Sequence, residues 1–71
     1  MILPLKDGRI AKPLSAKGVH LLCQITEGSS QHTVLVGCKQ AASKKLFREL
    51  YFAFGGERLF TESGEEFDPF G

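Results

Sequence analysis

The stretch "VHLLCQITEGSSQHTVLVGC", residues 19–38, decides the fold because it has the pattern of a β-hairpin. Apolar and polar side chains alternate on both sides of "EGSSQH", which is the period of half-buried strands. Directly opposed residues of a hairpin share a face, so the two apolar sets meet only where the numbers of the paired residues have an odd sum. A two-residue loop at Gly28 and Ser29, forming a type II′ turn, gives such a register, and a four-residue loop gives one too. The shorter loop predicts the pairs Val19–Cys38, Leu21–Val36, Cys23–Val34 and Ile25–His32.

The following segment, "QAASKKLFRELYFAF", predicts a helix over residues 40–54 that ends at two glycines. On a helical wheel, the apolar face comprises Leu46, Phe47, Leu50, Ala53 and Phe54. The opposite face carries Lys44, Lys45 and Arg48, and Phe52 lies among them. Phe52 is therefore the large apolar residue that we expect on the outside of the helix.

Residues 1–18 contain Pro4 and Pro13, which lack the N–H that a central strand donates, so we expect an edge hairpin or an extended arm. A type I′ turn at Asp7 and Gly8 would pair Lys6 with Arg9 and Leu5 with Ile10. Residues 57–62 read as a short strand, and residues 65–71 as a flexible acidic tail with two aromatics. The predicted fold is one α+β domain over residues 1–64, a small antiparallel hairpin sheet packed by one helix.

Composition narrows the class of protein. The 71 residues suffice for one small domain, and two cysteines are too few for a disulfide scaffold. Neither a signal peptide nor an apolar run of bilayer length is found, so we expect a soluble cytoplasmic protein with no membrane partner. Charge is uneven: residues 1–48 hold eight basic and two acidic residues, whereas residues 49–71 hold one basic and six acidic. Such a split is typical of a basic binding surface beside an acidic tail.

Catalytic and metal sites are not expected. His20 and Cys23 lie on opposite faces of a regular strand, so they do not converge on zinc. Cys23 and Cys38 are too far out of alignment in the hairpin for a disulfide. The carboxylates gather in the tail, where nothing holds them at the fixed separation that acid–base chemistry needs. We therefore expect a non-enzymatic protein without a cofactor, a metal or a small-molecule substrate.

A binding surface is the remaining interpretation. The candidate contact residues combine cations with exposed aromatics: Lys44, Lys45, Arg48 and Phe52 from the helix, Lys6, Arg9 and Lys12 from the arm, and Phe67 and Phe70 from the tail. Aromatic and arginine side chains dominate protein interfaces, so a protein partner is our first expectation. Single-stranded nucleic acid is the alternative, because cations neutralise phosphates and an exposed ring stacks on bases.

The tail "SGEEFDPFG", residues 63–71, has three interpretations. It projects as a hook whose Phe67 and Phe70 bind a partner, it folds back across the basic helix, or one of its phenylalanines completes a small core. Removing residues 65–71 would separate these interpretations.

In size and character, the whole chain resembles the small phage-encoded proteins that bind host RNA polymerase and redirect it. The resemblance rests on a compact domain with a hairpin, one helix, opposed charges and no catalytic set, and no residue is carried over from it. It implies a viral protein in the host cytoplasm that regulates transcription by binding polymerase, and thereby blocks initiation or changes termination.

Overall fold

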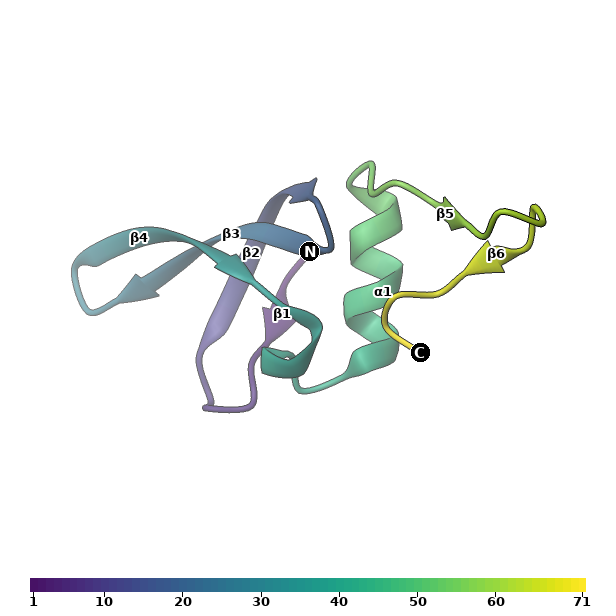
Figure 1. Ribbon diagram of the computed structural model, residues 1–71. Helices are drawn as coiled ribbons and strands as arrows, with labels where there is room; N and C mark the ends of the chain where they lie inside the picture. The colour runs from purple at the N-terminus through teal and green to yellow at the C-terminus, as the bar shows by residue number, and fades with distance from the viewer.

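The computed structural model describes residues 1–71 and shows an α+β fold (Figure 1). An antiparallel sheet is formed, in spatial order, by β1 (Leu3–Pro4), β2 (Ile10–Lys17), β3 (His20–Glu27) and β4 (Ser30–Val36). A 3-10 turn, η1 (Cys38–Gln40), leads to α1 (Lys44–Ala53), and β5 (Leu59–Phe60) pairs with β6 (Glu66–Phe67) in a separate hairpin. The antiparallel sheet with one α-helix confirms the predicted fold class.

The hairpin of β3 and β4 has the register that the apolar alternation requires. Leu21 pairs with Val36, Cys23 with Val34 and Ile25 with His32. The two-residue loop has Gly28 at φ +60° and no positive φ at Ser29, as a type II′ turn requires. The fourth expected pair, Val19 with Cys38, is not formed, because β3 begins at His20 and β4 ends at Val36. Val19 instead lies in the turn between β2 and β3.

The first hairpin differs from the expectation by one residue. Leu3 pairs with Ala11 and Pro4 with Ile10, so a five-residue loop joins β1 to β2. The Leu5 N–H donates to the Arg9 carbonyl at 2.9 Å, and the Gly8 N–H donates to the Leu5 carbonyl at 3.1 Å. Gly8 has φ +92°, which suits a three-residue loop with glycine in the left-handed region, so the local turn sets this register. Leu5 also forms a bridge to Ala41 ahead of the helix.

β2 is a central strand although it contains Pro13, which corrects our expectation for residues 1–18. β1 pairs with only Ile10 and Ala11, so the β1 side of β2 is open where Pro13 lies. The pairing with β3 also shifts between Pro13 and Ser15, which leaves Leu14 as the additional residue of a bulge. A proline is tolerated at such a place because no ladder hydrogen bond is lost.

α1 is shorter than predicted and is rotated about its axis. α1 begins at Lys44 instead of residue 40, because Gln40 belongs to η1 and the Ser43 hydroxyl caps α1 by accepting a hydrogen bond from the Leu46 N–H at 3.1 Å. The buried residues are Phe47, Leu50 and Tyr51, whereas Ala53 is exposed. Tyr51 is drawn inward because its hydroxyl donates a hydrogen bond to the Gly18 carbonyl in the turn between β2 and β3.

The core lies between the inner face of the sheet and α1. Its buried residues come from all parts of the chain: Leu3, Leu5, Ala11, Leu21, Cys23, Ile25, Val36, Ala41, Phe47, Leu50, Tyr51 and Phe70. Both cysteines are free thiols. α1 and η1 are the helical elements of the chain, and neither has the length or the hydrophobicity that crossing a bilayer requires.

The tail is part of the fold, which corrects the expected boundary at residue 64. Glu66 and Phe67 form β6, and the chain then returns to α1. The Phe70 ring is only 7% exposed and packs edge-to-face on Phe47 and Tyr51, with centroids 5.2 and 5.0 Å away. Of the three interpretations of the tail, the structure therefore has the one in which a phenylalanine completes the core.

Candidate binding groove

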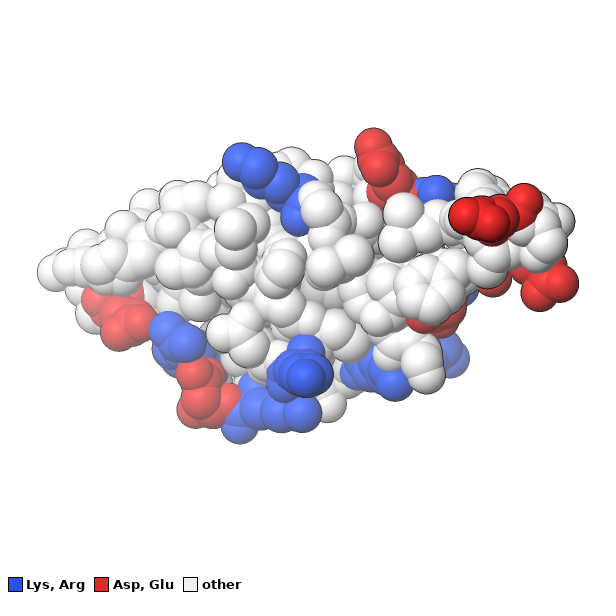
Figure 2. All heavy atoms as spheres, in the orientation of Figure 1, with Lys and Arg blue, Asp and Glu red and all other residues white.

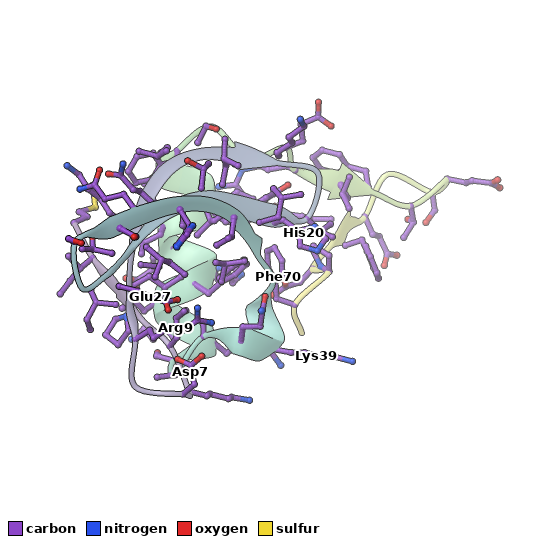
Figure 3. All side chains as sticks on the ribbon, turned by 90° about the vertical axis from the view of Figure 1, so that its left-hand side faces the viewer. Asp7, Arg9, His20, Glu27, Lys39 and Phe70 are labelled. Atoms are coloured by element: carbon purple, nitrogen blue, oxygen red, sulfur yellow. The ribbon has the colours of Figure 1, made fainter.

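The largest recess on the molecule is an open groove of about 610 Å³ at the amino-terminal end of α1. Four separate segments line it: the loop after β1, the turn between β2 and β3, residues 37–44, and the carboxyl end of the chain. In Figure 3, His20 and Phe70 lie close together at the groove, and Lys39 extends from η1 below them. The docked tail contributes Pro69 and Phe70 to the lining of this groove.

Backbone hydrogen bonds place the basic side chains of the groove. The Lys6 N–H donates to the Gln40 carbonyl, and the Ala42 N–H donates to the Pro4 carbonyl, both at 2.9 Å. The turn at η1 is braced in addition, because the Gly37 N–H donates to the side-chain oxygen of Gln40 at 2.7 Å. These contacts hold the loop after β1 against η1, so Lys6 and Lys39 leave neighbouring points of the backbone.

The groove is cationic and is partly apolar. Lys6, Lys39 and Lys44 line it, and no aspartate or glutamate does. Figure 2 shows most of the visible basic atoms along the lower edge of the molecule, with acidic atoms among them at its left and further acidic atoms at the β5–β6 end. The exposed apolar lining comes from Val19 and Ala42, whereas Ala41 and Phe70 are nearly buried in the groove wall. This arrangement suits a ligand that carries negative charge beside apolar groups.

Asp68 fixes the tail at the border of the groove. One carboxylate oxygen accepts from the Phe70 N–H at 2.9 Å, and the other accepts from Arg48 Nε at 3.0 Å. The Phe70 N–H is the largest cause of a pKa of Asp68 below its usual value, and the charges of Arg48 and Lys44 lower it further. Arg48, expected to contact a partner, is therefore engaged within the chain.

Arg9 is also engaged within the chain. Its guanidinium bonds Asp7 through Nε at 2.8 Å and Glu27 through Nη1 at 3.0 Å. The Arg9 N–H, which donates to Asp7 at 2.9 Å, is the main reason that the pKa of Asp7 is lowered. Lys12 lies beside Arg9 in a second, smaller recess with Gln24 and Gln31, away from the groove. Arg9 and Lys12 are thus not part of the same site as Lys6.

Phe52 is not the free aromatic that the helical wheel indicated. Its ring is half-buried, and the guanidinium carbons of Arg48 and Arg58 lie 5.2 and 4.8 Å from its centroid. Arg58 in turn pairs with Glu66 of β6. Cation–π contacts of this kind occupy the ring surface on which a base would stack.

The structure therefore divides the expected contact residues. Lys6 and Lys44 meet in the groove, whereas Lys45 is exposed on α1 outside it. Phe67 is 53% exposed on the β5–β6 hairpin and remains open for contact. Phe70 forms part of the groove wall but is buried, so the expectation that it hooks a partner is wrong for the docked tail.

Two groove residues were missing from the sequence-based set. Lys39 immediately precedes the expected helix and counts among the basic residues, so its charge was a usable signal. His20 reaches the groove because Gly37 lies next to its ring, a contact between β3 and the end of β4 that no local pattern indicates. No group of three or more histidine, cysteine or acidic side chains is arranged to hold a metal ion.

Comparison of the chain with protein-family models, with curated proteins and with solved structures found no match.

Proposed function

We propose that this chain is a small non-enzymatic binding protein that regulates a larger protein by occupying part of its surface. The cationic groove is the candidate contact site, and an acidic segment that also carries apolar side chains is its ligand. The observation that carries the proposal is the convergence of Lys6, Lys39 and Lys44 around apolar surface without any carboxylate in the lining.

The charged and the apolar residues of the groove would contribute to binding in different ways. The ammonium groups attract an acidic segment and raise the rate of encounter. The exposed apolar surface of Val19 and Ala42 then contributes contacts that persist in salt, because burial of apolar area is not screened. The hydrogen-bonded backbone at Lys6 and Gln40 keeps the site in place before binding, which lowers the entropy cost of association.

The larger partner that we propose first is RNA polymerase, since the chain resembles phage-encoded regulators of that enzyme. On this proposal, the groove binds an acidic surface segment of a bacterial polymerase and alters initiation or termination.

Single-stranded nucleic acid is the second candidate, because the same three ammonium groups suit phosphates. It is less well supported, since Phe52 is covered by Arg48 and Arg58 and offers no open stacking platform beside the lysines.

A charge-reversal experiment tests the groove. The groove variant Lys6→Glu/Lys39→Glu/Lys44→Glu is compared with the control Lys12→Glu/Lys17→Glu/Lys45→Glu, which changes the net charge equally outside the groove. Each protein is titrated against bacterial RNA polymerase by surface plasmon resonance, and against labelled single-stranded DNA and RNA at low and moderate salt. Far-UV circular dichroism verifies that both variants fold.

The expected result is polymerase binding that is about 100-fold weaker for the groove variant and nearly unchanged for the control, on about 1 kcal/mol for each reversed charge. Equal losses in both variants would contradict a specific groove. Strong, steeply salt-dependent binding of the single strands, lost only in the groove variant, would transfer the proposal to nucleic acid.

A further inference from the structure

The two edges of the main sheet are protected very differently. β1 is two residues long, contains Pro4, and continues into the bridge between Leu5 and Ala41. β4 is seven residues long, pairs only with β3, and keeps an unbroken register. Its sequence "SQHTVLV" contains no charged residue and no proline. Natural proteins normally protect a long edge strand by charge, proline or a bulge. β4 lacks all three, which is typical of an edge strand that pairs with another strand.

The turn geometry identifies which backbone groups are free. In a two-residue hairpin the residues that flank the loop, Glu27 and Ser30, form a hydrogen-bonded pair. Alternation along β4 then directs the N–H and C=O groups of residues 30, 32, 34 and 36 toward β3. The groups of Gln31, Thr33 and Leu35 point away from the sheet, along its open edge. Leu35 is also 50% exposed through its side chain.

We propose that β4 pairs with β4 of a second copy of this chain, antiparallel and about a two-fold axis at Thr33. In this register Thr33 faces the second copy's Thr33, and Gln31 faces the second copy's Leu35. All three outward-facing residues then pair with outward-facing residues, which gives about six backbone hydrogen bonds, two for each pair. The two sheets become one continuous sheet, and the exposed edge disappears.

Charge favours a second copy as the occupant. No like charges meet along the interface because β4 carries no charged residue, and its threonine and two valines are well suited to cross-strand contact. Glu27 at the hairpin tip stays paired with Arg9 of its own copy, so it brings no unpaired charge to the interface.

Analytical ultracentrifugation from about 1 μM to about 1 mM, a range that covers weak association, tests the proposal on the full chain. We expect the mass to rise with concentration from 7.8 kDa to twice that value. Amide hydrogen exchange by NMR should slow with concentration at Gln31, Thr33 and Leu35. His32 and Val34 should be protected at every concentration, because they already bond to β3.

Two variants of Thr33 and one control locate the interface. Thr33→Pro removes one outward N–H from each copy, and the loss of two hydrogen bonds weakens dimerisation about 30-fold. Thr33→Lys places like charges opposite each other and weakens it as well. The control Thr26→Lys makes the same charge change on β3 and leaves the association unchanged. A monomer at all concentrations, a dimer insensitive to both Thr33 variants, or protection of residues 31, 33 and 35 only after a different protein is added would overturn the proposal.

Discussion

Replacing Phe70 with alanine tests whether the tail is part of the core. The Phe70 side chain is only 7% exposed, and burial of a phenylalanine stabilises the folded state by about 1.5–3 kcal/mol. Its two edge-to-face contacts with Phe47 and Tyr51 add about 0.5–1.5 kcal/mol each. The tail can detach instead of leaving an empty cavity, so we expect the lower end of the total, a loss of about 3 kcal/mol.

That loss is large for a chain of this length. A domain of 71 residues has a free energy of unfolding of about 4–10 kcal/mol, so Phe70→Ala removes a third or more of it. The melting temperature should fall by about 12–24 °C. Urea titration followed by tyrosine fluorescence measures the change directly, because the chain has one tyrosine, Tyr51 beside Phe70, and no tryptophan.

Phe67→Ala is the matched control, since it removes the same side chain from the same segment where it is 53% exposed. We expect a change within about 0.5 kcal/mol for this variant, as for surface substitutions generally. If both variants lose the same small amount of stability, the docking of Phe70 on α1 is refuted, and with it the wall of the groove.

Two further substitutions, one at Asp68 in the tail and one at Gly56 after α1, test contacts near α1. Because the pKa of Asp68 is lowered in the folded chain, its stabilising effect is complete above the ordinary carboxyl pKa and is lost as pH falls through the lowered value. The free energy of unfolding should therefore drop below about pH 4, and it should drop less steeply in Asp68→Asn. An identical drop in the variant would contradict the role of this carboxylate. Gly56→Ala places a methyl group against the ring of Tyr51, so the free energy of unfolding measured by urea titration should fall by about 1–3 kcal/mol. The control Gly37→Ala, whose new methyl group would lie 3.5 Å from His20, should lose much less stability. Equal losses would rule out the close approach at Gly56.

The central hairpin was predictable because its information is local. The alternation of apolar residues and the glycine of the loop agree on one register, and Leu21, Cys23 and Ile25 are buried together as the pattern requires. The α+β class follows from the same signals, since the helical segment lies directly after the hairpin. Parity is a strong constraint wherever one face of a hairpin is buried.

The remaining errors share a physical cause, which is contact between distant segments. The Gly18 carbonyl accepts from the Tyr51 hydroxyl and so rotates the helix. The first hairpin is the exception, because its register follows a local loop closed by the Leu5 N–H and the Arg9 carbonyl. Phe70 enters the core from the end of an acidic segment, against its local composition. The groove inherits this difficulty, because its lining residues come from four separate stretches of the chain.

The β5–β6 hairpin holds acidic side chains away from the cationic groove. It carries Glu65 and Glu66 at one end of the molecule, whereas the lysines of the groove lie at the amino-terminal end of α1 (Figure 1). If the groove binds a negatively charged partner as proposed, repulsion of the β5–β6 carboxylates would favour encounters in which the groove faces that partner. The acidic residues would then affect the orientation of approach without contacting the partner.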